Sequence, residues 1–115
     1  GRMVQMSLQA AEELEKDGIH VEVVDIRSIL PLDRDTIVKS VLKTHHVLIV
    51  HEAVQFGGFG GEIASEIADS EAFYHLDAPI RRLGALSCPI PFNPILEKAT
   101  FPTVEKIVDQ VKSLL

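Results

Sequence analysis

Segments with helical spacing of apolar residues alternate along the chain with short, almost wholly apolar segments. Helical spacing marks four stretches: residues 4–14, 33–42, 62–72 and 103–115. Three stretches between them have the composition of strands: residues 20–27, 47–50 and 80–83. The order helix, strand, helix, strand, helix, strand, helix predicts an α/β domain, with a mostly parallel sheet and helices on both of its faces.

The apolar stripes predict which side of each helix turns inward. In the first helix the inward set is Val4, Leu8, Ala11 and Leu14, and in the last it is Val104, Ile107, Val108, Val111, Leu114 and Leu115. Gly18 stands where a helix C-cap glycine belongs, while Asp33 and Thr103 are suitable N-caps. The ends of three helices are therefore predicted as well as their faces.

The first predicted helix has no strand before it, although a helix in such a fold normally follows one. Three strands would also make a thin sheet for a domain with helices on both faces. We therefore expect a further strand upstream of Gly1, and residues 1–115 to form a single domain of a longer chain.

Composition excludes several classes of protein. The formal net charge is −6, from 17 acidic and 11 basic residues, which argues against a nucleic-acid surface. No apolar run approaches the ~20 residues that span a bilayer, so no membrane contact is predicted. The single cysteine, Cys88, excludes an internal disulfide framework and favours a reducing compartment.

The glycine-rich loop at residues 57–61 follows a predicted strand and precedes a helix, as phosphate-binding loops do. Its spacing does not fit, because counting G-x-G-x-x-G from Gly58 puts Ile63 at the third glycine. Glu62 stands where a P-loop would carry lysine, and Glu52 adds further negative charge. Two interpretations remain: a tight turn that packs against neighbouring backbone, or a protein interface that presents Phe56 and Phe59.

The titratable residues form no complete catalytic or metal-binding pattern. None of the five histidines has a partner four residues away on a helix, and adjacent His45 and His46 point in opposite directions on an extended chain. Cys88 has no nearby base in the sequence and is expected to be an inert thiol. His51 and Glu52 lie where open α/β sheets bind ligands, but such a pair is more often structural.

An ordered set of short motifs resembles one family. Residues 23–33 (VVDIRSILPLD) are similar to its strand-and-turn motif, and residues 51–60 (HEAVQFGGFG) to its glycine loop. Residues 76–82 (LDAPIRR) and 89–92 (PIPF) resemble two later elements in the same order. Together they resemble the C-terminal domain of the β subunit of thiamine-diphosphate-dependent 2-oxo acid dehydrogenases, which is transketolase C-terminal-domain-like.

That resemblance implies a three-layer α/β/α fold with a five-stranded mixed sheet. It implies a holoenzyme that oxidatively decarboxylates a 2-oxo acid on thiamine diphosphate with Mg and acylates lipoyl groups. The cofactor would bind outside this chain, so no catalytic, cofactor-binding or metal-binding residue is assigned here, and the isolated chain is expected to be inactive. The location implied is the cytoplasm of a bacterium or the mitochondrial matrix of a eukaryote.

The resemblance also implies partners: an alpha subunit, a second beta subunit and the subunit-binding domain of a dihydrolipoyl acyltransferase. It places acyltransferase docking near Asp109 and the carboxylate of Leu115 on the last helix. The dimer or interdomain contact is expected in the glycine loop and the strand end before it, at His51, Glu52, Phe56, Gly57, Gly58, Phe59 and Gly60.

The motif at residues 51–59 is slightly more similar to branched-chain enzymes, so 2-oxoisovalerate is favoured over pyruvate as the substrate. Three alternatives remain: a pyruvate dehydrogenase beta subunit, the C-terminal domain of a transketolase or deoxyxylulose-phosphate synthase, and a free-standing binding module.

Overall fold

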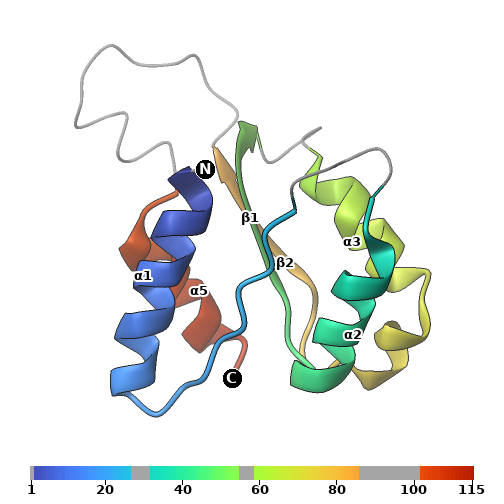
Figure 1. Cartoon of the computed structure of the whole chain (residues 1–115), viewed down its shortest axis with the longest axis horizontal. Helices are drawn as coiled ribbons and strands as arrows, with labels where there is room; N and C mark the ends of the chain where they lie inside the picture. The colour runs from blue at the N-terminus through green and yellow to red at the C-terminus, as the bar shows by residue number, and fades with distance from the viewer. Residues whose placement is uncertain (1, 27–31, 55–58, 86–101) are drawn as a thin grey trace.

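The computed structural model describes residues 2–26, 32–54, 59–85 and 102–115 (Figure 1). Their elements, in chain order, are α1 (Arg2–Lys16), α2 (Arg34–Thr44), β1 (Leu48–Val54), α3 (Gly60–Ala68), the 3₁₀ helix η1 (Glu71–His75), β2 (Arg81–Ala85) and α5 (Val104–Ser113). No helix among the described residues is both long and apolar enough to cross a bilayer.

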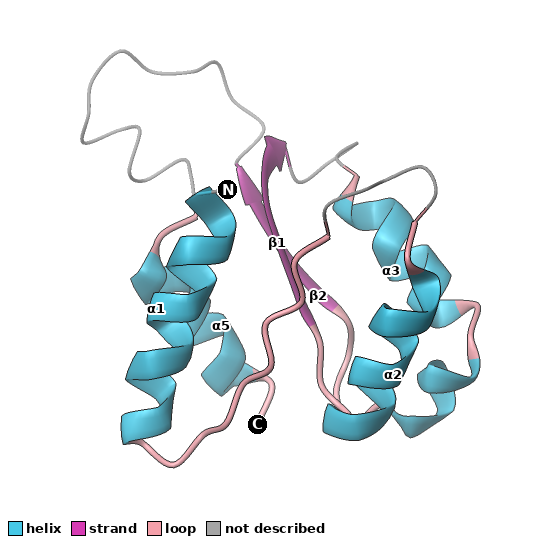
Figure 2. Cartoon of the chain, viewed as in Figure 1, coloured by secondary structure: helices cyan, strands magenta, loops and turns pink. Residues whose placement is uncertain are grey.

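Strands β1 and β2 form a parallel pair between two layers of helices. Leu48 pairs with Arg81 and Val50 with Leu83, and the register shifts before Val54 pairs with Ala85. Helices α1 and α5 lie on one side of the pair, and α2 and α3 on the other (Figure 2). All four begin at the end of the molecule where β1 ends (Figure 1). The predicted α/β class and the parallel strands are thereby confirmed.

Local sequence signals account for the helix ends. Gly18 has φ of 78°, and the N–H groups of Gly18 and Ile19 donate to the carbonyls of Glu15 and Leu14, which is a Schellman cap. The Asp33 carboxylate accepts from the Thr36 N–H at 3.2 Å, and the Thr103 hydroxyl accepts from the Lys106 N–H at 3.2 Å. All three predicted caps are confirmed.

The core has two parts, one on each side of β1. Beneath α2 and α3 the buried cluster comprises Ile37, Val41, Ile49, Ile63, Ile67 and Ala72. On the side of α1 and α5, Ala10, Leu14, Ile107 and Leu114 are buried. In the predicted stripe of α5, Ile107 and Leu114 are buried as expected, but Leu115 is wrong: it lies beyond the end of the helix and is exposed.

The predicted inward face of α1 is wrong at one position. Leu8 is 50% exposed, whereas Ala10 and Leu14 are almost completely buried. The helix is rotated so that the row Ser7, Ala10, Leu14 faces inward, because these residues are three and four apart and lie on one side. Leu8 lies outside that row, because it directly follows Ser7 and consecutive residues of a helix point to different sides.

The predicted helix 62–72 is two elements in the structure. α3 ends at Ala68, and the separate 3₁₀ helix η1 begins after Ser70, whose hydroxyl accepts from the Ala72 N–H at 3.2 Å. Ser70 is an N-cap in extended conformation, so its side chain starts a new turn instead of continuing the old one.

The predicted strand 20–27 forms no ladder within the described residues, which include 20–26. The sheet described comprises β1 and β2 alone, where the resemblance implied five strands. Residues 20–26 run in the same direction as β1, between the two helix layers (Figure 1). A strand requires a neighbour at ~4.8 Å, and a cavity lies between this segment and β1.

Candidate functional site

The residues expected at an interface gather where β1 ends and α3 begins. His51 and Glu52 belong to β1, Phe59 is the N-cap residue of α3, and Gly60 is its first residue. Phe59 is half-buried and packs against the core cluster. The predicted interface residues Phe56, Gly57 and Gly58 lie outside the described residues, as does the side chain of Glu52.

The imidazole of His51 lies directly against the first turn of α3. A Cβ atom added to Gly60 would be 2.7 Å from both Cδ2 and Nε2 of His51, and 3.3 Å from Cγ2 of Ile49. Both ring nitrogens of His51 are shielded from solvent. Glycine at position 60 therefore lets the helix begin in contact with the strand, which agrees with the packing interpretation of the loop.

Arg82 makes the corresponding contact from β2. It pairs in register with Ile49, and its Nη1 would be 3.1 Å from a Cβ on Gly61. An imidazole and a guanidinium thus lie under the two glycines that open α3. Their arrangement joins the two strands to one helix N-terminus.

This helix N-terminus does not fit a diphosphate. The N–H groups of Glu62 and Ile63 already donate to the carbonyl of Phe59, at 3.0 and 3.3 Å. His51 covers Gly60, and the carboxylate of Glu62 lies in the first turn, where it would repel an anion. The described residues of this site provide a packed junction instead of a cradle for phosphate.

Within the described part of the chain, no three histidine, cysteine, aspartate or glutamate side chains converge, so these residues form no cluster that could hold a metal ion. His45 and His46 have different partners, but His45 is the C-cap residue of α2 with φ of 63°, so the extended chain expected for this pair is wrong. Nδ1 of His45 lies 2.8 Å from the His75 carbonyl oxygen, and Nδ1 of His46 lies 3.0 Å from that of Thr44. Cys88 lies outside the described residues.

The second predicted site is on α5. Asp109 is exposed, and Leu115 is 66% exposed just beyond the end of the helix. α5 lies beside α1, and Lys112 of α5 forms an ion pair of 2.9 Å with Asp17, which follows α1. Asp109 and Leu115 therefore belong to the layer of α1 and α5, whereas His51 belongs to the sheet.

The layer formed by α1 and α5 carries many exposed carboxylates, which the sequence motifs did not indicate. We call it the α1/α5 surface; its exposed carboxylates are Glu12, Glu13, Glu15, Asp17, Glu105 and Asp109. The exposed lysines on it, Lys16 and Lys112, are each paired with one of these carboxylates. The helical spacing of the acidic residues gave a signal, but only the contact between α1 and α5 joins the two groups.

Comparison with known proteins identifies the family. The model of the transketolase C-terminal domain matches residues 1–107. The chain belongs to the transketolase C-terminal domain family. The sequence-based resemblance to β subunits of 2-oxo acid dehydrogenases is also confirmed, since similar proteins are named as beta subunits of pyruvate dehydrogenase.

The chain is 42% identical to the mitochondrial pyruvate dehydrogenase E1 component subunit beta of Caenorhabditis elegans, over 99% of this chain and 32% of that protein. It is 45% identical to the corresponding subunit of Staphylococcus epidermidis, over 100% of this chain and 35% of that protein. The chain thus spans about a third of the length of these relatives. The preference for 2-oxoisovalerate is not supported, because both relatives are named for pyruvate.

A solved structure shares the fold. A split-gene transketolase, described as an inactive beta4 tetramer, superimposes with a TM-score of 0.83 at 29% sequence identity. The match covers 100% of this chain and 36% of the other. The three-layer arrangement of the family therefore applies to this chain.

Proposed function

We propose that this chain is the C-terminal assembly domain of the beta subunit of a pyruvate dehydrogenase. It would join subunits and dock the acyltransferase, while thiamine diphosphate and Mg act elsewhere in the holoenzyme. The observation that carries the proposal is the match of almost the whole chain to about a third of pyruvate dehydrogenase beta subunits. The packed junction at His51, which does not fit a diphosphate, supports placing the chemistry outside this domain.

The assignment of pyruvate as the substrate is tested with the holoenzyme. Full-length beta subunit reconstituted with its alpha subunit should have a higher kcat/KM for pyruvate than for 2-oxoisovalerate. The 115-residue chain alone should decarboxylate neither. A preference for the branched substrate would contradict the assignment, and turnover by the chain alone would contradict the division of labour.

Acyltransferase docking is proposed at the α1/α5 surface. After the two lysine pairs are counted, this surface keeps a net negative charge, which complements a basic partner. Asp109 lies on this surface and takes no part in the core, because the inward side of α5 is formed by residues such as Ile107. A docked basic domain would therefore be held by charge and released by salt.

Charge reversal tests the docking site. Asp109→Lys should weaken binding of the acyltransferase subunit-binding domain about five- to tenfold, since one exposed ion pair is lost and a repulsion replaces it. Asp35→Lys on α2, in the opposite helix layer, is the matched control and should change the affinity less than about twofold. Calorimetric titration at two salt concentrations measures both, with pyruvate decarboxylation as the check on folding. Equal affinities of the two variants would refute docking at this surface.

A second candidate is a transketolase, favoured by the structural match to the split-gene protein. The two readings differ in partner: only the dehydrogenase requires a lipoyl-bearing acyltransferase. Binding of that acyltransferase by the reconstituted enzyme supports the first reading, and ketol transfer between sugar phosphates without such binding supports the second.

A further inference from the structure

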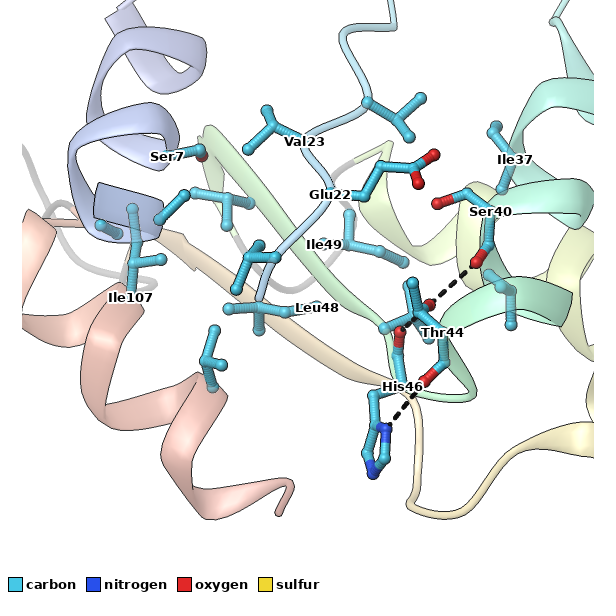
Figure 3. A pocket seen from close by; sticks show the side chains of 18 of the residues that line it. Ser7, Glu22, Val23, Ile37, Ser40, Thr44, His46, Leu48, Ile49 and Ile107 are labelled. Atoms are coloured by element: carbon cyan, nitrogen blue, oxygen red, sulfur yellow. Dashed lines mark hydrogen bonds between the residues drawn. The ribbon is translucent and has the colours of Figure 1, made fainter. Parts of the chain in front are cut away.

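A groove lies on the outer side of α2, where this helix meets the segment that joins α3 to η1. Its volume is about 360 Å³. Its lining includes two half-buried apolar residues that pack on the core and four exposed charged residues, which we call the rim: respectively Val38 and Leu42, and Asp35, Lys39, Asp69 and Glu71. Figure 3 shows the opposite side of α2, where Ile37, Ser40 and Thr44 line the apolar cavity beside β1. The groove therefore belongs to the outer surface of the layer formed by α2 and α3.

The rim of this groove has an excess of negative charge. Arg34 also lines the groove, but its guanidinium is already held: Nε lies 3.4 Å from the carboxylate of Glu66, and Nη2 donates to the carbonyl of Asp69 at 3.1 Å. The rim itself comprises three carboxylates and one ammonium group. An apolar floor beneath a negative rim complements a long cationic side chain, whose methylene groups pack below while its charge stays among the carboxylates.

Two exposed aromatic side chains stand beside the groove on η1. Phe73 is 52% exposed and Tyr74 is 85% exposed, and their ring centroids lie 5.9 Å apart in an edge-to-face contact. Glu71 of the rim begins the same short helix, so the aromatic pair and the groove are parts of one surface. Aromatic residues are enriched at protein interfaces, and a guanidinium stacks on an aromatic ring better than an ammonium group does. The pair therefore favours arginine over lysine as the cation.

η1 is held at both of its ends. At its start the hydroxyl of Ser70 accepts from the N–H of Ala72 at 3.2 Å, and Ala72 is completely buried. At its end Nδ1 of His45, the C-cap residue of α2, lies 2.8 Å from the carbonyl oxygen of His75. A surface fixed in this way loses little conformational freedom on binding, which favours affinity.

We propose that the groove and the aromatic pair of η1 form a docking site for an arginine-bearing segment of the alpha subunit. The guanidinium would lie among the rim carboxylates and stack on Tyr74, and its stem would cover Val38 and Leu42. The site rests on the proposed function, which supplies the alpha subunit as a partner. A second copy of this chain fits less well because it carries the same net charge of −6, and the acyltransferase is assigned to the α1/α5 surface in the opposite helix layer.

Substitutions in the full-length beta subunit test the site. Glu71→Lys and Tyr74→Ser should each weaken binding of the alpha subunit about tenfold, whereas Tyr74→Phe, which keeps the ring, should stay within about twofold of the unmodified protein. Glu105→Lys is the matched control, since Glu105 is also an exposed glutamate in the first turn of a helix, and it should change the affinity less than about twofold. Thermal unfolding of each free beta subunit checks its folding. Unchanged affinity of folded Glu71→Lys and Tyr74→Ser would overturn the proposal.

A photocrosslink identifies the occupant of the site. Full-length beta subunit with a photoreactive phenylalanine analogue at position 74 is assembled with the alpha subunit and the acyltransferase, irradiated, and digested with a protease that cleaves at acidic residues. Mass spectrometry should find position 74 joined to a peptide of the alpha subunit that contains arginine. A crosslink to a second beta subunit, to the acyltransferase or to an alpha peptide without arginine would overturn the proposal.

Failure of this site is distinct from failure of the proposed function. An enzyme that assembles and decarboxylates pyruvate, but gives no crosslink from position 74 to another chain, contradicts the docking site alone. An enzyme that does not act on pyruvate contradicts the proposed function, whatever the crosslink shows.

Discussion

Replacement of Gly60 by alanine should loosen the junction between β1 and α3. The new Cβ would be 2.7 Å from Cδ2 and Nε2 of His51, well short of the ~3.5–4.0 Å at which carbon atoms pack. The ring has little room to withdraw, because both of its nitrogens are shielded from solvent. Overpacking of this kind costs about 1–3 kcal/mol, and the gain of alanine over glycine in a helix offsets at most about 1 kcal/mol.

With a cost in the middle of that range and the full offset, the expected net loss is about 1 kcal/mol in the free energy of opening α3. Amide exchange of α3 in the full-length protein should therefore become about fivefold faster. Gly61→Ala is the matched control, since its Cβ would meet only the flexible end of Arg82 at 3.1 Å. That variant should change exchange by about twofold at most.

A double-mutant cycle identifies the cause. If the clash with the imidazole is responsible, His51→Ala should remove most of the penalty of Gly60→Ala, with a coupling of about 1 kcal/mol. Equal effects of alanine at positions 60 and 61, or a cycle without coupling, would refute the reasoning.

Three other expectations test local features of the fold. Leu14→Ala should lower the free energy of unfolding by about 2–5 kcal/mol because the side chain is completely buried, whereas Leu8→Ala should lower it by less than about 1 kcal/mol. Equal losses for the two variants in chemical denaturation of the full-length protein would contradict the observed rotation of α1. Thr103→Ala should destabilise α5 by about 1 kcal/mol through loss of its N-cap, against little change for exposed Ser65→Ala, as read from α5 amide exchange. Hydrogen bonds from Thr36 lower the pKa of Asp33. The stability that the Asp33 cap gives to α2 should therefore be complete above the ordinary pKa of aspartate and be lost as the pH falls through the lowered pKa. Amide exchange of α2 that stays constant through that acid range, or an Asp33→Asn variant with the same pH dependence, would contradict this expectation.

Features set by neighbouring residues could be predicted from the sequence. Gly18, Asp33 and Thr103 act within one turn of their own helix, so the local sequence was enough to identify them as caps. The parallel order of strands followed from the alternation of helices and strands. The face of α1 could not be derived in the same way, because Leu8 and Ala10 both continue an apolar row and only packing against α5 decides between them.

Features that depend on distant or external partners were beyond the sequence pattern. Residues 20–26 have the composition of a strand, but a ladder requires a partner, and β1 lies across a cavity. The substrate preference was drawn from the loop at residues 51–59, where the structure shows packing against His51. Specificity is expected outside this domain, so these residues carry little information about it.

The shared direction of the four helices has an electrostatic consequence. Because α1, α2, α3 and α5 all begin where β1 ends (Figure 1), their peptide dipoles add instead of cancelling. Each helix places roughly half a negative charge at its final turn, so the end of the molecule where the helices stop is negative even before any side chain is counted. A cationic partner would be oriented by this field during approach, and its association rate, more than its lifetime on the surface, should fall as salt is added.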